Sequence, residues 1–521
     1  MSVQAGPDEG VVCTPHPLAT EAGLAVLREG GTAAAAAVAA GAVLAVVCPH
    51  FCGLGGDAVW MLSDSEGLRT CVLGIGQAAE VIDTSGPIPT RGPGSMLTTA
   101  GLVPSWERLL EISRSRWNGR LPLDRLLEPA IAYAEAGFEV GASHAFWLDY
   151  RKEEIKDWPG FADAFQPWRK TPDVGALFRQ PDLADLLRML VCEELDSFHS
   201  GAVALRIAEG LAAAGSPISE DDLARTHAVE VTPLSLRSGA WTLFAPPPPT
   251  QGATTLAIRG ILDRIAGVPS DRTCALHRQV EAVKQAFLCR GTIADPEFSD
   301  QSGALPSNAA LQRLASAIAA DHAMPWPREL QTADTAFLAV TDAQGRSVCG
   351  LQSTYFDWGS GVPVGDTGIL WHNRGAAFDT MPGSPNCLAP GKRPFHTLNP
   401  GMAFTDDGAA IFYGTQGADG QPQTLTVLLD RLMCDGASAA EALSTPRYLL
   451  GRTFSDKNDT LKIETSVGEE VVADLEYLGH EVAPLPELSP LAGLAGVIRI
   501  DPAGHKDAAH DPRGDGTAGK A

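Results

Sequence analysis

Hydrophobic positions recur with two different periods along the chain, and the change falls near residue 335. Between about residues 105 and 240, apolar residues return every three to four positions, which is typical of amphipathic helices. The helices expected there include 123–136, 181–195 and 202–214. Beyond residue 335, short apolar runs between Gly-rich turns predict strands. These strands are expected over 336–341, 347–353 and 409–414, so the chain combines helices and strands.

The N-terminal region contains a long run of Ala and Val, residues 33–48. Pro17 suits a helix start and Pro49 stops a helix, so we predict a loop followed by one long, buried helix. The run is shorter than the ~20 apolar residues of a membrane span. Residues 1–12 lack the basic and apolar regions of a signal peptide, so we expect a cytoplasmic protein. The polar, Gly- and Asp-rich residues 504–521 predict a disordered tail.

Charge narrows the possible partners. Among 521 residues, 39 are Lys or Arg and 63 are Asp or Glu, which gives a formal net charge of −24. An acidic chain is a poor match for nucleic-acid phosphates and for anionic lipid, so we expect neither as a partner. The ten cysteines form no CxxC pair and no zinc-finger spacing. We therefore expect reduced thiols. No motif signals a metal or an organic cofactor, and we expect neither.

Ordered motifs then point to a specific chemistry. Thr335 opens an apolar strand that ends in Asp342-x-x-Gly345. Other short signatures lie along the chain at residues 14–23, 48–57, 245–252, 281–287, 295–298, 359–361, 368–370, 393–394 and 414–423. Each signature alone is weak, but their order over nearly the whole chain resembles the gamma-glutamyltranspeptidase family.

This resemblance implies the four-layer αββα sandwich of the N-terminal-nucleophile hydrolases. It also implies that a precursor cuts itself between Asp334 and Thr335. The large segment 1–334 and the small segment 335–521 would share one sandwich and remain associated, and a dimer of such pairs is compatible with this. A Thr hydroxyl is a weak nucleophile, but the α-amine freed by the cut can act as its base.

The resemblance also assigns roles within the catalytic frame. Ser353 falls where the family keeps a second hydroxyl that hydrogen-bonds the nucleophile. Gly417 and Ala418 lie in the Gly-rich stretch whose backbone N–H groups stabilise the oxyanion. Such preorganised donors supply a large share of catalysis in acyl transfer. Thr335, Ser353, Gly417 and Ala418 are therefore the predicted catalytic residues.

The residues that would hold a glutamate are not kept. Residues 73–79 contain no Arg, and Ala376-Ala377 replace the family's acidic pair before Phe378. A different acyl group is the simplest inference, because a carboxylate left without its Arg loses a bidentate pair. The sequence is similar to the branch that includes oxamate amidohydrolases and carbon–carbon hydrolases of lincomycin- and pyrrolobenzodiazepine-type pathways. The substrate residues expected there are Tyr355, Asn373, Arg374, His396 and Thr397.

Three functions follow from this interpretation. The leading hypothesis is a hydrolase for a small carboxylate-bearing amide or an activated, oxalyl-type C–C bond, with Arg374 and His396 holding the carboxylate. The second is gamma-glutamyl transfer or hydrolysis on glutathione-like amides. The third is an uncleaved, non-catalytic homologue, because Ala336 and Phe337 replace the Thr and His that usually follow the nucleophile.

Overall fold

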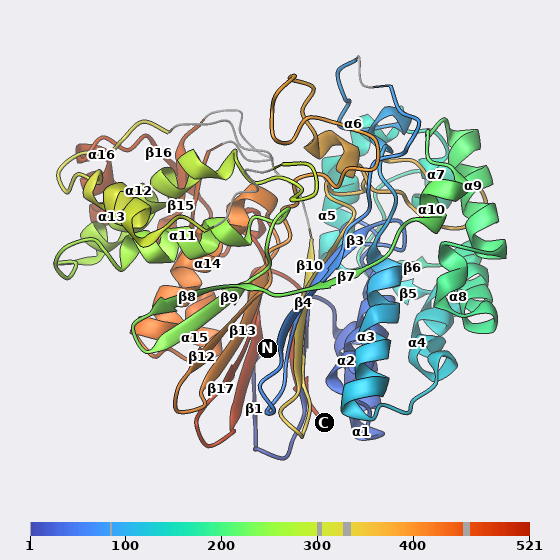
Figure 1. The fold of residues 1–521 in the computed structure, drawn as a ribbon, viewed down its shortest axis with the longest axis horizontal. Helices are drawn as coiled ribbons and strands as arrows, with labels where there is room; N and C mark the ends of the chain where they lie inside the picture. The colour runs from blue at the N-terminus through green and yellow to red at the C-terminus, as the bar shows by residue number, and fades with distance from the viewer. Residues whose placement is uncertain (1, 84–85, 300–304, 327–334, 452–458) are drawn as a thin grey trace.

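Two seven-stranded antiparallel sheets form the centre of the molecule, and helices cover their outer sides (Figure 1). The computed structural model describes residues 2–83, 86–299, 305–326, 335–451 and 459–521. Sheet I has the order β19 (Thr517–Lys520), β2 (Val11–Thr14), β10 (Ala336–Thr341), β11 (Ser347–Ser353), β3 (Asp57–Ser63), β4 (Arg69–Gly74) and β7 (Val229–Val231). Sheet II has the order β1 (Ser2–Ala5), β18 (Lys506–His510), β17 (Ala495–Ile500), β13 (Ala410–Thr415), β12 (Gly401–Thr405), β9 (Trp241–Ala245) and β8 (Leu234–Ser238).

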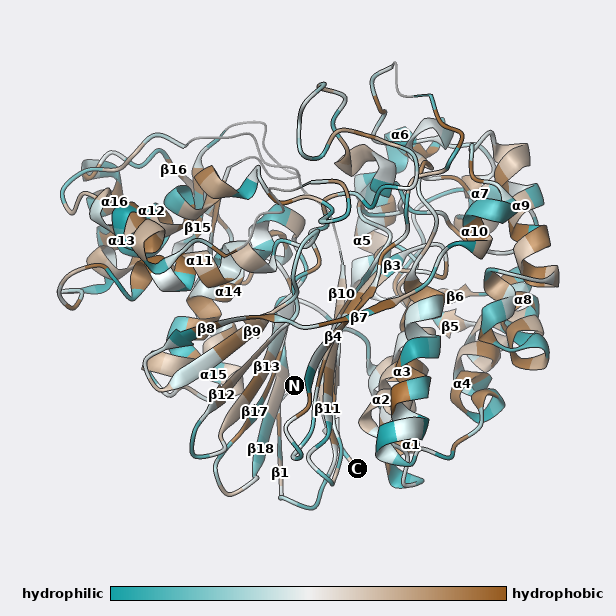
Figure 2. Ribbon diagram, in the orientation of Figure 1, coloured by the Kyte–Doolittle hydropathy of each residue, from teal (hydrophilic) through white to brown (hydrophobic). Residues whose placement is uncertain are grey.

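The helices divide into two outer layers with mixed polar and apolar faces (Figures 1 and 2). One layer covers sheet I and contains α1 (Pro17–Arg28), α2 (Ala33–Val47), α3 (Leu102–Trp117), α4 (Leu123–Ala136), α5 (Ala142–Tyr150), α6 (Lys152–Ile155), α7 (Phe161–Phe165), α8 (Pro181–Glu193), α9 (Ala202–Ala214) and α10 (Glu220–Ala224). The other covers sheet II and contains α11 (Gly252–Leu262), α12 (Arg272–Arg290), α13 (Asn308–Ser316), α14 (Gln421–Leu429), α15 (Ala439–Ser444) and α16 (Glu469–Tyr477). Small sheets of β5 (Phe138–Glu139) with β6 (Leu177–Phe178), and of β14 (Tyr448–Leu450), β15 (Leu461–Glu464) and β16 (Val482–Leu485), complete the fold.

Strand β10 shows how the apolar pattern builds the layers. All six of its residues are buried. Ala336, Leu338 and Val340 contact the helical layer over sheet I, whereas Phe337 and Ala339 lie in the core between the two sheets. Since successive side chains of a strand point to opposite faces, a continuous apolar run is expected where both faces are covered. This arrangement confirms the expected four-layer αββα sandwich.

Helix α2 is buried along its whole length, as its Ala- and Val-rich sequence predicts. The expectation of one continuous helix from Pro17 is wrong, because the chain turns between α1 and α2. Gly30 has a φ of 79°, a left-handed conformation that favours glycine. At Gly31, a Cβ would lie 2.5 Å from a methyl carbon of Val26. These two glycines therefore end α1 and let α2 pack against it.

The predicted disordered tail is also wrong. Residues 504–521 contain β18, which pairs with β1 and β17 in sheet II, and β19, which pairs with β2 in sheet I. Composition misled the prediction because the order of this segment comes from backbone hydrogen bonds to strands far away in sequence. Within the part of the chain that the structure describes, no helix is both long and apolar enough to cross a bilayer.

Candidate active site

Thr335 lies immediately before β10 and is 1% exposed. Its hydroxyl donates a hydrogen bond to the Oγ of Ser353, with 3.4 Å between the two oxygens. Because the antiparallel register pairs Ala336 with Gln352, Thr335 lies beside Ser353, the last residue of β11. Asp334, on the other side of the predicted cleavage site, falls outside the described residues. The sheet therefore brings the predicted nucleophile and its second hydroxyl together.

Phe337 stands where the family that the sequence resembles usually has His, and it packs in the core between the two sheets. Its ring covers two glycines of sheet II, and a Cβ at Gly414 or Gly496 would lie 2.4 or 2.6 Å from ring carbons of Phe337. The ring therefore fills the space between the sheets directly beneath the start of β10. It supports the position of Thr335 by packing.

Tyr355 links Ser353 to a buried cation. Its backbone N–H donates to the Ser353 Oγ at 2.8 Å, and its φ is 80°, which is rare for an aromatic residue. Conformations of this kind cost about 1–3 kcal/mol and are often found at functional sites. The guanidinium carbon of Arg374 lies 3.8 Å from the centre of the Tyr355 ring, a cation–π contact.

Arg374 is completely buried and lies in a short 3-10 turn, Arg374–Ala377. Its Nη1 donates to the Thr397 hydroxyl at 3.4 Å, whereas Nε and Nη2 have no hydrogen-bond partner. In the described part of the chain, no carboxylate forms an ion pair with this guanidinium. Burial lowers the pKa of Arg374 to about 10, so the group is still charged at neutral pH. A buried, unpaired guanidinium is costly, and the carboxylate of a ligand would satisfy it.

The Gly-rich loop approaches the same place from sheet II. Gly417 and Ala418 have φ values of 116° and 42° and lead into α14. The Gln251 amide donates to the carbonyl of Ala418 at 2.7 Å and to the carbonyl of Thr397 at 2.6 Å. Gln251 therefore connects the Gly-rich loop to Thr397, whose hydroxyl accepts a hydrogen bond from Arg374. Ala418 also packs against Tyr355. Gln251 and Tyr355 thus connect the predicted oxyanion residues to the surroundings of Arg374.

An ion pair anchors this loop. The Asp419 carboxylate, next to Ala418, pairs with the guanidinium of Arg290 at the C-terminal end of α12. Both side chains are largely buried, at 6% and 11% exposure. A buried pair of this kind fixes its backbone strongly, because removing one partner leaves the other uncompensated.

Asp57 is a buried residue that the sequence analysis did not single out. One of its carboxylate oxygens accepts the backbone N–H groups of Gly76 and Gly101, each at 3.0 Å. The other lies 3.1 Å from the Nε2 of His396 and 3.4 Å from the Nδ1 of His372. Burial alone would raise the pKa of Asp57, but the two histidines hold it well below its usual range. A charged residue opening a buried strand, directly after Gly-Leu-Gly-Gly, was the signal available in the sequence.

His396 and Asn373, which the sequence predicts to contact the substrate, are hydrogen-bonded to protein groups in this structure. Both ring nitrogens of His396 are engaged, Nε2 with Asp57 and Nδ1 with the backbone N–H of Leu398 at 3.3 Å. Burial and the nearby Arg374 lower the pKa of His396 to about 4, so the ring is neutral. The Asn373 amide accepts from the N–H of Phe356 at 3.0 Å and donates to the carbonyl of Thr90 at 2.7 Å. These two side chains brace the loops that carry Arg374, Tyr355 and Thr397.

One group of side chains outside this site has metal-ligating types. His277, Glu281 and His480 are buried, with candidate ligand atoms within 4.8 Å of one another. They are already engaged, because His277 Nδ1 lies 2.9 Å from His480 Nε2 and the Lys284 ammonium donates to Glu281 at 2.7 Å. A lysine ammonium beside the carboxylate disfavours a second cation there. This arrangement fits a hydrogen-bond network better than a metal centre.

Comparison with known proteins gives consistent results. The gamma-glutamyltranspeptidase family model matches residues 19–521. An oxamate amidohydrolase proenzyme from Klebsiella pneumoniae is 43% identical over 516 residues, covering 98% of each chain. A glutathione hydrolase-like proenzyme from Bacillus subtilis is 36% identical, again over 98% of each chain. The crystal structure of a cephalosporin acylase from Bacillus halodurans superposes with a TM-score of 0.91 at 28% identity, covering 100% of this chain and 96% of the acylase.

Proposed function

The chain belongs to the gamma-glutamyltranspeptidase family of N-terminal-nucleophile hydrolases, and on that premise we propose a specific activity. The chain cleaves itself before Thr335, and Thr335 then hydrolyses a small amide whose scissile carbonyl is bonded directly to a carboxylate. Oxamate is the simplest such substrate, and the similarity to an oxamate amidohydrolase proenzyme supports it.

The observation that carries this proposal is the unpaired, fully buried guanidinium of Arg374. Its two nitrogens without a partner among the described residues, Nε and Nη2, suit the two oxygens of a carboxylate, and charge-assisted bonds of this geometry are strong. Tyr355 connects Arg374 to Ser353 and therefore to Thr335. A substrate anchored at Arg374 needs its scissile bond close to its carboxylate, which favours a short, oxalyl-type acid.

The reaction then follows from the groups around Thr335. The α-amine of Thr335 accepts the hydroxyl proton while Oγ attacks the carbonyl carbon of the amide. The backbone N–H groups of Gly417 and Ala418 donate to the oxyanion that forms. As the C–N bond breaks, the proton passes to the leaving nitrogen, and ammonia departs from oxamate. Water then attacks the oxalyl ester on Thr335, releases oxalate and restores the hydroxyl.

Cleavage would leave the fold intact in this proposal. Strand β10 of segment 335–521 pairs with β2 of segment 1–334, and β11 pairs with β3. The two segments therefore share the hydrogen bonds of sheet I and the cores on both of its faces. We expect them to remain one unit after the cut.

Gamma-glutamyl hydrolysis is the second candidate, since the Bacillus subtilis relative is named glutathione hydrolase-like. A gamma-glutamyl group carries an ammonium that needs an acidic partner. The positions expected to supply it are Ala376 and Ala377, which pack as apolar residues near Tyr355. An activated C–C bond next to a carboxylate would fit the same anchor as an oxalyl amide.

A substrate comparison tests the proposal. Ammonia release from oxamate is measured beside release from acetamide, which lacks the carboxylate, and beside cleavage of a gamma-glutamyl anilide. We expect turnover of oxamate alone, and its loss in an Arg374→Met variant. Strong turnover of the anilide with none of oxamate would refute the oxalyl assignment. An intact single chain with no activity on any of the three would support the non-catalytic alternative.

A further inference from the structure

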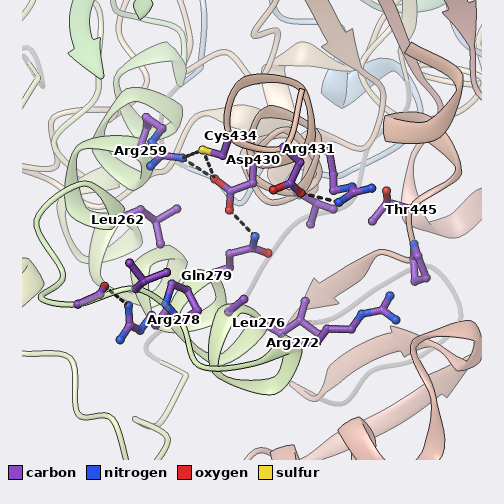
Figure 3. Close-up of a pocket in the computed structure, with 17 residues that line it drawn as sticks. Arg259, Leu262, Arg272, Leu276, Arg278, Gln279, Asp430, Arg431, Cys434 and Thr445 are labelled. Carbon is purple, nitrogen blue, oxygen red and sulfur yellow. Dashed lines mark hydrogen bonds and ion pairs between the residues drawn. The ribbon is translucent and has the colours of Figure 1, made fainter. Parts of the chain in front are cut away.

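A cavity lies in the helical layer over sheet II, between α11, α12 and the end of α14 (Figure 3). Its volume is about 700 Å³, within the range of ~300–1,000 Å³ that small-molecule sites occupy. One part of the wall is apolar and includes Leu262, Leu276 and Val427. The C-terminal end of α14 continues as a π-helical turn, Asp430–Cys434, which forms another part of the wall. Such turns frequently occur at functional sites.

Arginines give this cavity a positive character in an otherwise acidic protein. Two of the four lining arginines are neutralised, because Arg259 pairs with Asp430 and Arg431 pairs with Asp435, each at 2.5 Å. The other two, Arg272 and Arg278 of α12, form no ion pair with the described residues.

Arg272 and Arg278 supply the free charge. Arg278 donates to the carbonyl of Gly267 at 2.7 Å (Figure 3). Arg272 donates to the carbonyl of Val467 at 3.2 Å. Among the described residues, no carboxylate lies within ion-pair distance of either guanidinium. Bonds to neutral carbonyls leave two positive charges at the cavity, which would attract an anion.

Gln279 supplies a second, independent signal. The residue is 8% exposed, and its amide nitrogen donates to Asp430 at 2.5 Å (Figure 3). Its Oε1 is buried and has no hydrogen-bond partner among the residues that the structure describes. A buried acceptor without a partner is costly, so a ligand that brings an N–H or O–H group to this atom would gain by satisfying it.

We propose that this cavity binds a small organic acid that has an apolar body and one hydrogen-bond donor. The carboxylate meets Arg278, the apolar body packs on Leu262 and Leu276, and the donor bonds to Gln279 Oε1. This site is separate from Thr335 and is not needed for the hydrolysis proposed above.

The two helices that form the cavity also lead to the candidate active site. Helix α14 starts immediately after the Gly417–Gly420 loop and ends at the cavity wall. Helix α12 lines the cavity with its N-terminal half, and its last residue, Arg290, pairs with Asp419 of that loop. A ligand bound in the cavity therefore contacts the two elements that hold the predicted oxyanion donors.

Calorimetry with indole-3-acetate tests the proposal, because this probe combines a carboxylate, an apolar ring and an N–H donor. We expect saturable binding to the full-length protein. Indole-3-ethanol, without the carboxylate, and 1-methylindole-3-acetate, without the N–H, should each bind about tenfold more weakly or not at all. Arg278→Gln and Gln279→Leu should weaken binding of the acid by a similar factor.

Controls place the binding in this cavity. Arg313→Gln changes an exposed arginine of α13 outside the cavity and should bind the acid as the unmodified protein does. Arg374→Met should also leave binding unchanged, and Arg278→Gln should hydrolyse oxamate at the normal rate in the absence of the acid. Absence of saturable binding at millimolar acid, or equal affinity in Arg278→Gln and Gln279→Leu, would overturn the proposal. Loss of binding in Arg374→Met would place the acid at the active site and overturn it as well.

Discussion

Arg374 allows a prediction in which activity and stability change in opposite directions. Burial lowers the pKa of its guanidinium from 12.5 to about 10. At ~1.4 kcal/mol per pKa unit, this shift means that burial in the ligand-free protein disfavours the charged guanidinium by about 3 kcal/mol relative to water. Arg374→Met removes the charge and keeps most of the side-chain volume. We therefore expect Arg374→Met to raise the free energy of unfolding by about 1–3 kcal/mol, since the lost contact with Tyr355 offsets part of the gain.

The same substitution should nearly abolish hydrolysis of oxamate. Two charge-assisted hydrogen bonds to the substrate carboxylate are lost, at about 1.5–3 kcal/mol each. The specificity constant kcat/KM should fall by about a hundredfold or more. Arg374→Lys keeps the charge but cannot form the bidentate pair, so its activity should lie between the two.

Arg447 provides the matched control. It is also fully buried, but it pairs with Asp511 at 2.5 Å and donates to the carbonyl of Gly493 at 2.7 Å. Arg447→Met should lower the free energy of unfolding by about 3 kcal/mol, the lower end of the range for breaking a buried ion pair, because Asp511 loses Arg447 but keeps its ion pair with Arg513. Both variants are compared by thermal and urea unfolding in a Thr335→Ala background, which keeps cleavage out of the comparison. If Arg374→Met is as destabilising as Arg447→Met, Arg374 is a structural residue and the reasoning fails.

Three further predictions concern the surroundings of Thr335 and the buried histidines. Ser353→Ala removes the hydroxyl that accepts from Thr335 and should lower kcat about tenfold in steady-state assays; an unchanged kcat would remove Ser353 from the mechanism. Asp419→Asn breaks the ion pair with Arg290 and should lower kcat by at least about tenfold with KM nearly unchanged, whereas a change in KM alone would contradict an oxyanion role for the loop. Burial lowers the pKa of several histidines to about 3 or 4, so the unfolded chain binds more protons below pH 6.5. The free energy of unfolding should therefore fall steadily as the pH falls from 6.5 to 4, and a flat urea-unfolding profile over that range would disprove this. These histidines are His16, His144, His199, His396, His480 and His510.

Local patterns predicted the elements whose structure depends on local sequence. The strand expected over 336–341 has the bounds of β10, and the helix expected over 123–136 has the bounds of α4. Helix α4 has a clear amphipathic period, strand β10 is a continuous apolar run, and both end at turn residues. The break between α1 and α2 was missed because Ala-rich sequence outweighed Gly30 and Gly31, whose effect depends on packing against Val26.

Long-range contacts set the features that the sequence did not reveal. Residues 504–521 are polar and Gly-rich, yet they pair as edge and inner strands with segments more than 500 residues away. The Asp57 site has the same origin, because its two histidines come from loops more than 300 residues later. The motif order could nominate Thr335, Ser353 and the Gly417–Ala418 loop. Only the assembled fold shows that Arg374 has no acidic partner in the described part of the chain, whereas His396 bonds to Asp57.

The central claim is that Thr335 becomes an N-terminal nucleophile, and intact-mass analysis of the purified protein tests it most directly. The account predicts two fragments, residues 1–334 and 335–521, with Thr335 at the new N-terminus. It also predicts one uncut chain for Thr335→Ala, and a transient mass increase on the small fragment alone when oxamate is added and the reaction is quenched. A fully active protein that stays as one chain, or one cut at a different residue, would contradict the account.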